Sequence, residues 1–467
     1  MYAISKYKKQ IIASCIHLFV LVISLFIWGI FFPANMSPDS IDQYGQAATN
    51  EYHDWHPPIM ALILAVVMKC GGDIGTCMLI QCLAGSFGVY YLARCIAGLT
   101  IQNDCLVQYI AVIVFLLLLL PISPLAFYLM TFWKDAWCAI AFLWIFSIAI
   151  ILYKRVSSLT TSQFFFLYFG LIILIALTIL ARYNALLTVP LFIALLWFII
   201  YRRISSHRIA IFFSLLPIVL YGGIICVQYT FFNITKRHPE QQIMALDLVG
   251  MIVLKPSLRH EFPYTSQNLQ ENYQDDYRYG DVGPLYWATP LIIDESYTYN
   301  EKMVQEYRRA IIHFPLLWFK VKLRAFHELI RPTITHYWFH SIIVNNQFGL
   351  TPNLLFQKIR EKFIQIAQRI VTNRWLRLFS GVHLLWISVN IIGCVVVLFL
   401  YLKYRNPDLI FWGIVLGIPF TYSCSYLLAT PARDFRFMYP STLSIQILSL
   451  SKFLGAVVMA RKTVYQR

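Results

Sequence analysis

The chain has 467 residues, of which 59% are hydrophobic and 13% are charged, and its mean hydropathy is +0.63. A soluble globular protein carries about 25% charged residues, so the composition excludes that class and predicts an all-α polytopic membrane protein. The net charge of +16 does not indicate nucleic-acid binding, because most Lys and Arg residues flank apolar runs or lie along amphipathic segments, where anionic lipid explains them.

About ten apolar runs are expected to be transmembrane helices, since crossing a bilayer takes about 20 apolar residues. They cover residues 11–32, 74–98, 105–120, 136–153, 163–181, 185–201, 208–231, 381–402, 409–428 and 438–458. With a cytoplasmic N-terminus, the basic clusters that flank these runs fall on the cytoplasmic side, as the usual excess of Lys and Arg in cytoplasmic loops requires. Both termini are therefore expected to be cytoplasmic, and the first loop is expected to face the other side.

The predicted spans divide the chain into three parts. A transmembrane core, 1–231, contains the first outer loop, 33–73; a long outer segment, 232–380, follows; and the last transmembrane helices occupy 381–467. Within the first outer loop, residues 57–69 form an apolar stretch of only 13 residues, which is too short to cross. If it did cross, the later basic clusters would change sides, so we expect a helix lying at the outer surface.

The long outer segment is expected to contain both irregular and helical structure. Residues 256–294 are rich in Tyr, Asn, Gln, Asp and Pro, which is typical of loops. Residues 301–331 have a helical pattern suited to the headgroup boundary. Its apolar face is predicted to hold Trp318, Phe319, Leu323 and Phe326, and its polar face Lys320, Lys322 and Arg324.

Residues 36–58 of the first outer loop are unusually acidic. Within 16 positions they carry four of the 22 acidic residues of the chain, and they contain no Lys or Arg: the four are Asp39, Asp42, Glu51 and Asp54. Ser37-Pro38-Asp39-Ser40 is also typical of a helix start, so Asp39 or Asp42 could serve as a cap. The alternative is that one carboxylate handles a proton.

Four basic residues are predicted on the outer face, against the charge bias: Lys134, Arg182, Arg433 and Arg436. Cations beside an acidic loop suggest a site for an anionic group, and a lipid phosphate or pyrophosphate is the natural anion there, since Arg grips it in bidentate fashion. Each has a simpler reading. Arg182 could extend to the headgroups, and Arg433-Asp434 and Lys134-Asp135 could be surface ion pairs.

The histidines and cysteines do not predict a metal site or a cofactor. His53 and His56 are three residues apart, and His336 and His340 are four apart, spacings that place two ligands on one helical face. Neither pair has a third ligand at a usual spacing. The ten cysteines lie almost entirely in or beside apolar runs and include no CxxC pair, so a disulfide framework is not expected either.

Several short motifs together resemble one family. An outer Asp soon after the first span, in SPDSIDQYGQA, is followed by YHDWHPPI, an aromatic-His-Pro-Pro run that opens a juxtamembrane helix. With Arg182-x-Asn184, IIHFPLLWFKVKLR and the late DFRFMYP, this pattern resembles the polytopic glycosyltransferases of the GT-C class. That class includes protein O-mannosyltransferases, aminoarabinose transferases of lipid A and bacterial polysaccharide-modifying enzymes, and the last group is the most similar.

The resemblance implies a reaction and roles for these residues. The donor would be a polyprenyl-phosphate-linked sugar, the acceptor a glycan or a lipid-linked molecule, and the outcome inversion at the anomeric carbon. Asp39 would be the general base, although relatives often have Asp-Glu where this chain has Asp39-Ser40, which keeps Asp42 open as the base. The implied substrate-binding residues are Trp55, His56, Lys134, Arg182, Asn184, Arg433, Arg436 and Tyr439.

The resemblance further implies a bacterial inner-membrane enzyme with a periplasmic active site and no required metal or other cofactor. Two other functions remain open. A polysaccharide polymerase would use similar chemistry with a pyrophosphate leaving group. A lipid or polysaccharide flippase is less favoured, because transporters carry ionisable residues near the bilayer midplane and here the spans are almost free of charge.

Overall fold

The computed structural model describes residues 2–120, 123–269, 273–281, 299–331, 343–380, 382–430 and 432–465. Across these residues the protein is α-helical, with isolated β-bridges and no strand. Nine of the described helices are long and apolar enough to cross a membrane. The all-α polytopic fold expected from the sequence is therefore confirmed.

The nine long helices match nine of the expected spans. They include α1 (Tyr2–Phe31), α4 (Ile74–Ala97), α7 (Lys134–Arg155), α8 (Thr161–Ala181), α9 (Val189–Ile204), α10 (His207–Phe231), α20 (His383–Tyr404), α21 (Asp408–Leu428) and α22 (Tyr439–Tyr465). The 3-10 turns η1 (Tyr183–Thr188) and η3 (Phe435–Met438) run directly into α9 and α22, and α9 reaches the length of a span, 22 residues over Tyr183–Ile204, only together with η1. Residue 381, where one expected span begins, lies outside the described residues.

The tenth expected span is α5 (Asp104–Leu119), which has 16 residues and is therefore short for a crossing helix. The chain nevertheless returns through α5 to the end of the bundle at which α4 begins. The Gln81 side chain, near the start of α4, donates hydrogen bonds to the carbonyl oxygens of Tyr128 and Thr131 at 2.9 Å, just before α7 begins. Since α4 and α7 start at the same end, α5 runs between the two ends.

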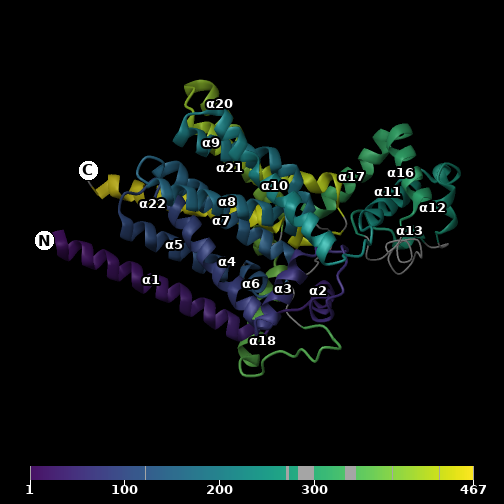
Figure 1. The fold of residues 1–467 in the computed structure, drawn as a ribbon, viewed down its shortest axis with the longest axis horizontal. Helices are drawn as coiled ribbons and strands as arrows, with labels where there is room; N and C mark the ends of the chain where they lie inside the picture. The colour runs from purple at the N-terminus through teal and green to yellow at the C-terminus, as the bar shows by residue number, and fades with distance from the viewer. Residues whose placement is uncertain are drawn as a thin grey trace.

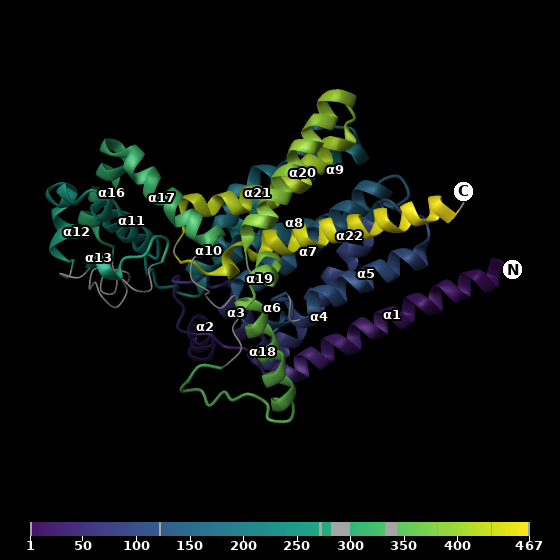
Figure 2. The same cartoon turned by 180° about the vertical axis from the view of Figure 1, so that it is seen from behind.

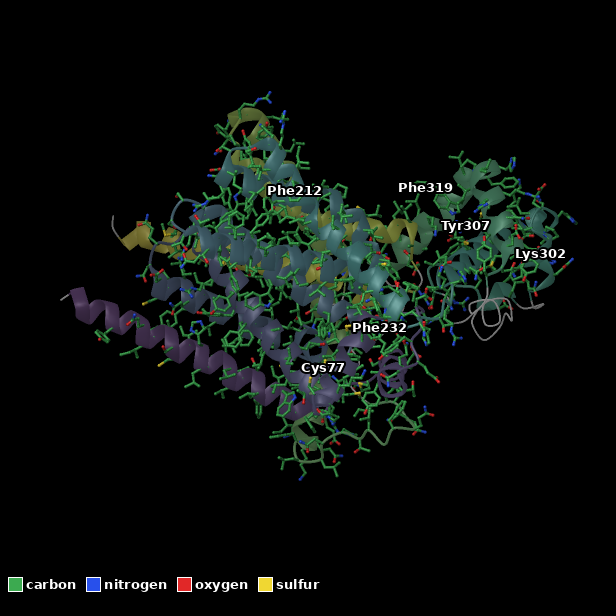
Figure 3. All side chains as sticks on the ribbon, viewed as in Figure 1. Cys77, Phe212, Phe232, Lys302, Tyr307 and Phe319 are labelled. Carbon is green, nitrogen blue, oxygen red and sulfur yellow. The ribbon has the colours of Figure 1, made fainter. Side chains whose placement is uncertain are left out.

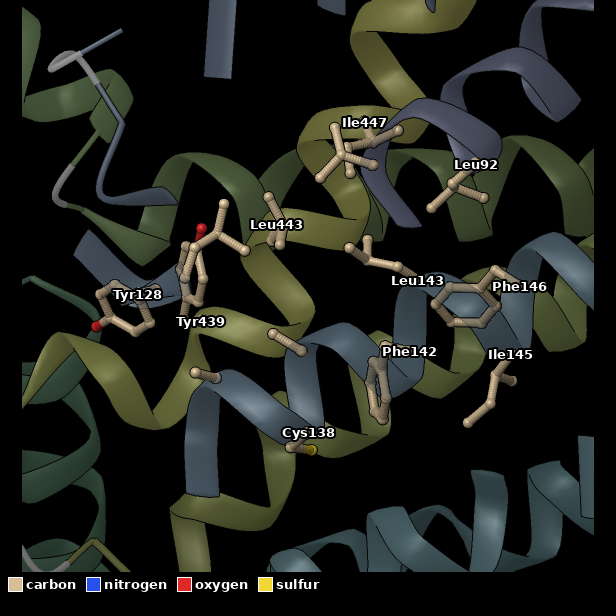
Figure 4. Close-up of a cluster of buried hydrophobic side chains, with 14 of the residues drawn as sticks. Leu92, Tyr128, Cys138, Phe142, Leu143, Ile145, Phe146, Tyr439, Leu443 and Ile447 are labelled. Atoms are coloured by element: carbon tan, nitrogen blue, oxygen red, sulfur yellow. The ribbon is translucent and has the colours of Figure 1, made fainter. Parts of the chain in front are cut away.

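Helix α7 lies inside the bundle, against α4, α8 and α22. Figure 4 shows its Phe142, Leu143 and Phe146 among the buried apolar side chains. Helix α4 comes close to its neighbours at Gly85, which has no side chain. A Cβ built there would lie 2.2 Å from Leu129 Cδ2, in the segment before α7, and 3.2 Å from Ile140 Cδ1 of α7. Close contact through glycine is typical of helix packing in membranes, where dispersion contacts replace the hydrophobic effect.

The two ends of the molecule differ. Figures 1 and 2 show both chain termini at one end and, at the other, a lobe of short helices outside the bundle. The first outer loop also lies toward the lobe end. It forms α2 (Pro38–Thr49) and α3 (Ile59–Lys69). Helix α3 has only 11 residues, so the short helix expected over 57–69 is present, while its position at the membrane surface stays a prediction.

The start of α2 follows the sequence signal. Ser37 is its N-cap, and its Oγ accepts a hydrogen bond from Ser40 N at 3.3 Å, while Pro38 occupies the first turn. The Ser side chain satisfies one of the unpaired N–H groups of the first turn, and proline has no N–H to leave unpaired there. This start fixes Asp39 in the first turn of α2.

The lobe is built from α11 (Glu240–Leu254), η2 (Pro256–His260), α12 (Pro263–Gln267), α13 (Tyr273–Asp276), α16 (Glu301–His313) and α17 (Pro315–Ile330). Its apolar core is separate from that of the bundle. The irregular structure expected over 256–294 is partly wrong, since its described part contains three short helices, and residues 282–294 lie outside the described residues. The helical pattern over 301–331 is confirmed, but as two helices that meet at Phe314, next to Pro315.

The prediction that Lys322 lies on the exposed polar face of α17 is wrong. This side chain is 1% exposed, and its Nζ lies 2.5 Å from Oδ2 of Asp247, which accepts a hydrogen bond from Tyr307 Oη at 2.9 Å. Beside Lys322 around the helix, Leu316, Phe319 and Leu323 are exposed, and Figure 3 shows Phe319 on the lobe. The sequence pattern alone placed the lysine on the solvent side because its partner lies about 75 residues away on α11.

Removing the Asp247 carboxylate is expected to destabilise the lobe. Asp247→Ala would leave the Lys322 ammonium buried without its counter-charge, which costs about 3–5 kcal/mol. Hydrogen exchange of α11 and α17 should therefore accelerate, while Lys320→Ala, at an exposed position of α17, should leave it unchanged. Wild-type exchange in Asp247→Ala would show that this pair does not stabilise the lobe.

Two helices before α20 were not expected from the sequence: α18 (Gln357–Thr372) and α19 (Arg374–Ser380). Figure 2 places α18 beside the end of α1 that lies far from the N-terminus. The ring of Phe363 packs on Phe31 of α1 and on Phe127, with centroid distances of 5.9 and 5.4 Å. This contact closes the bundle next to the first outer loop.

Candidate functional site

Charged side chains from five separate segments meet at the lobe end of the bundle. We call this group the Asp39 cluster. It comprises Asp39 of α2, His56 of the turn before α3, Lys134 and Asp135 at the start of α7, Arg182 after α8, and Asp434 and Arg436 at η3. Five of the ten site residues predicted from the sequence belong to it.

Asp39 contacts both an arginine and a histidine. Its Oδ2 lies 2.7 Å from Arg436 Nη1, and its Oδ1 lies 3.6 Å from His56 Nε2, while 32% of its side chain stays exposed. Burial by the surrounding protein raises the pKa of this carboxyl, but Arg436 and His56 outweigh that effect and hold the pKa well below 3.8. Asp39 is therefore an ionised carboxylate with an open side.

Arg436 connects Asp39 to the rest of the cluster. Its Nε lies 2.8 Å from Asp434 Oδ2 and 4.0 Å from Asp135 Oδ2, and its guanidinium stacks on the Trp133 ring at 4.8 Å from the centroid. Asp434 also accepts a hydrogen bond from Arg436 N at 3.1 Å, which caps η3. Burial raises the pKa of Asp434, although Arg436 opposes the shift. The stack and the cap orient the guanidinium toward Asp39.

Arg182 turns into the protein rather than toward the headgroups. It is 8% exposed, it donates to Asp135 Oδ1 through both Nε, at 2.6 Å, and Nη2, and it stacks on Phe437. Asp135 is fully buried. Arg182 therefore does not extend to the headgroups. It forms a buried ion pair with Asp135, between the end of α8 and the start of α7.

Lys134 and His56 extend the cluster toward Asp39. Lys134 Nζ donates to His56 Nδ1 at 2.6 Å, so the ring proton is on Nε2, the atom that faces Asp39. Burial lowers the pKa of His56, and the Lys134 charge lowers it further, so the ring is neutral near pH 7. In the described part of the chain, no carboxylate lies within ion-pair distance of Lys134.

The low pKa of Asp39 predicts a pH response that depends on Arg436. In wild-type protein Asp39 should remain ionised at about pH 5, because its folded pKa is depressed. In Arg436→Gln, burial should dominate and raise the pKa, so the protonated form should appear at that pH. Infrared difference spectra against Asp39→Asn would report the carboxylic acid band. Arg433→Gln is the control, and a protonated Asp39 in wild type at this pH would contradict the assignment.

Asp42 lies on α2 next to a different cavity. It contacts His53 Nε2 at 3.2 Å and Gln46 Nε2 at 2.8 Å, and 39% of its side chain is exposed. Burial raises its pKa, but the His53 hydrogen bond and charge hold it below 3.8. These side chains line an open cleft of about 870 Å³ with Asn50, Tyr52, Phe232, Asn233, Arg237 and Phe348. Figure 3 shows Phe232 above the first outer loop.

The remaining predicted site residues lie outside the Asp39 cluster. Arg433 Nη2 pairs with Asp281 at 2.9 Å and Nη1 lies 3.9 Å from Glu328, so this residue links the bundle to the lobe. The alternative surface pairs Arg433-Asp434 and Lys134-Asp135 do not form. Tyr439 is buried against Tyr128 with ring centroids 4.0 Å apart (Figure 4), and Asn184 and Trp55 are partly buried.

An apolar groove begins beside the cluster. Its volume is about 360 Å³, and it is lined by Ile59, Met60, Ile63, Ile80, Gln81, Ala84, Trp137, Ile140, Ala141, Trp144, Leu174, Leu177 and Ala181. Trp137 is one turn along α7 from Lys134, and Ala181 precedes Arg182. No side chain of the cluster lines the groove, but two of its lining residues are thus within one turn of Lys134 and Arg182.

No group of three or more His, Cys, Asp or Glu side chains with metal-binding geometry occurs among the described residues, and His336 and His340 fall outside them. Sequence reasoning gave Asp135 and Asp434 no role beyond surface ion pairs with their neighbours in sequence or, for Asp135, a helix start or a weak metal partner. The available signal was that Asp135 follows Lys134 directly and that Asp434 lies between Arg433 and Arg436. No protein-family model, curated protein or solved structure matches this chain.

Proposed function

We propose that the protein is an inverting glycosyltransferase that moves a sugar from a polyprenyl-phosphate donor to a glycan or lipid-linked acceptor. The observation that carries this proposal is the Asp39 cluster, in which an ionised, partly open carboxylate lies near three basic side chains, and an apolar groove begins within one turn of two of them. The charges suit a phosphate and the groove suits an isoprenoid chain. In this proposal the enzyme works at the periplasmic face of a bacterial inner membrane.

The donor phosphate would contact Lys134 first. This ammonium has no carboxylate at ion-pair distance among the described residues, whereas Arg182 is fixed by Asp135. The isoprenoid chain would enter the groove next to Trp137, which keeps the scissile bond near Asp39. Burying apolar chain atoms there contributes binding energy of about 25 cal/mol per Å².

Transfer then needs one base and one stabilised leaving group. Asp39 accepts the proton of the acceptor hydroxyl, whose oxygen forms a bond to the anomeric carbon. The bond from that carbon to the phosphate oxygen breaks on the opposite side, and polyprenyl phosphate leaves with the electron pair. Lys134 and Arg436 stabilise the charge that develops on the phosphate.

Through Arg436, binding of the donor phosphate would change the strength of Asp39 as a base. Arg436 Nη1 lies 2.7 Å from Asp39 Oδ2, and this contact keeps the carboxylate a weak base. A donor phosphate would compete for the same guanidinium. As Arg436 turns to the phosphate, the pKa of Asp39 would rise and the carboxylate would become a better proton acceptor.

The acceptor would approach through the cleft beside Asp42. Its lining combines carboxylate, amide and aromatic side chains, which suit the hydroxyl groups and apolar faces of a sugar. The same helix, α2, carries Asp39 in its first turn and Asp42 one turn later. An acceptor in the cleft would thus reach Asp39 along the helix start.

Comparison of surface glycans by mass spectrometry, with and without the gene, tests the proposal. Loss of one sugar substituent from glycans of unchanged chain length is the expected result. Glycans that stop at a single repeat unit would instead indicate a polymerase. Identical glycan masses in the two strains would contradict both functions.

A further inference from the structure

A second polar cavity lies at the end of the bundle opposite to the Asp39 cluster. It has a volume of about 560 Å³ and is formed by α4, α5, α7 and the loop between α4 and α5. Helix α7 begins at Lys134, in the cluster, and ends at Arg155, in this cavity. Its 22 residues separate the two by roughly 33 Å at 1.5 Å per residue. The cavity is at the same end of the molecule as both termini (Figure 1).

The charge of the cavity is positive. Arg94 of α4 and Lys154 and Arg155 of α7 line it, against the single carboxylate of Asp104. Lys154 Nζ donates to Gly98 O at 3.0 Å and so caps the end of α4. The guanidiniums of Arg94 and Arg155 make no hydrogen bond and no ion pair with any described residue.

Two other arginines at this end of the bundle are satisfied by the protein itself. Arg202 pairs with Asp408 at 3.0 Å, and Arg203 donates to Val156 O at 2.6 Å. A general excess of basic residues at one membrane face explains all four arginines equally. It does not explain why two of them converge, without partners, on one cavity.

The rest of the lining includes the polar residues Thr100 and Gln102 and several apolar side chains. Ile101, Val107, Ile150 and Ile151 contribute to it, as does Tyr91, whose hydroxyl lies 3.0 Å from His17 Nε2 of α1. A cavity with two unpaired guanidiniums above aliphatic side chains fits an amphiphile with an anionic head. A small inorganic anion would use only the polar part.

We propose that this cavity binds a phosphate-bearing ligand through Arg94 and Arg155, with the phosphodiester headgroup of an anionic phospholipid as its natural source. Arginine grips phosphate oxygens in bidentate fashion, and pockets of this kind between transmembrane helices suit acidic headgroups. A soluble phosphate offers the same oxygens, so the two sources share their chemistry. This site is separate from the donor site proposed above and does not depend on it.

Native mass spectrometry of the purified full chain tests this site. Phosphatidylglycerol and phosphatidylcholine with identical acyl chains are added at equal concentration. Wild-type protein should retain phosphatidylglycerol roughly tenfold more, because each guanidinium contributes charge-assisted hydrogen bonds. The double variant Arg94→Gln/Arg155→Gln should lose that preference, and the matched control Arg202→Gln/Arg203→Gln should keep it.

Competition with inorganic phosphate distinguishes the two sources. If millimolar phosphate does not displace the lipid, the ligand is the headgroup; if phosphate displaces it from wild type, a soluble phosphate compound is the ligand of the same site. A wild-type preference that survives in Arg94→Gln/Arg155→Gln would overturn the proposal. So would the absence of any preference in wild type, a measurement that does not depend on the variants folding.

Discussion

Asp39→Asn is expected to lower the rate of sugar transfer by about 10²- to 10⁴-fold, the usual contribution of a positioned general base. Asparagine has nearly the same shape and retains an oxygen for Arg436, so the variant should insert and fold as wild type does. Transfer by the purified variant and its elution profile in detergent are the two measurements. Wild-type activity in Asp39→Asn would remove Asp39 from the mechanism.

Asp42→Asn is the matched control, because Asp42 lies three residues further along the same helix. Asp42 lies at the cleft with His53 and Gln46 rather than at Arg436. Its replacement should weaken acceptor binding, seen as a higher KM, and leave kcat within about tenfold. The opposite pattern, with a silent Asp39→Asn and an inactive Asp42→Asn, would assign the base to Asp42.

Asp135→Ala is expected to destabilise the protein by about 3–5 kcal/mol, since it leaves the Arg182 guanidinium buried without its carboxylate. The double variant Asp135→Leu/Arg182→Met removes both charges and should regain most of the thermal stability. Replacing a buried ion pair with apolar residues of similar volume is often neutral or stabilising. Heat-induced loss of monodisperse protein in detergent measures both effects.

The same pair of variants separates stability from function. If Arg182 helps to hold the donor phosphate, the double variant should be stable but should transfer sugar at least tenfold more slowly than wild type. A double variant that is stable and fully active would restrict Arg182 to a structural role. A double variant as unstable as Asp135→Ala would show that the charge balance is not what limits stability.

The sequence predicted the elements better than the contacts. Apolar runs determine the spans because the bilayer demands length and composition, and the start of α2 was visible because Ser37-Pro38 satisfies a local rule. Helices α18 and α19 were missed since their amphipathic pattern lies in a long polar segment. Lys322 was misplaced because its buried partner lies on another helix.

The gathering of Asp39 and Arg436 followed from predicted sidedness alone, since both were expected on one face. Their pairing did not. Neighbours in sequence suggested the pairs Lys134-Asp135 and Arg433-Asp434, whereas the folded chain pairs Asp135 with Arg182 and Asp434 with Arg436. Successive residues at a helix start point in different directions, so each finds its partner on another segment.

Reconstitution tests the central claim most directly. Purified protein in proteoliposomes is given a polyprenyl-phosphate-linked labelled sugar and the surface glycan from the strain that lacks the gene. The account predicts that one polyprenyl phosphate is released for each sugar transferred, and that Asp39→Asn abolishes both. Label that crosses the bilayer without transfer, or polyprenyl phosphate release that is unchanged in Asp39→Asn, would contradict it.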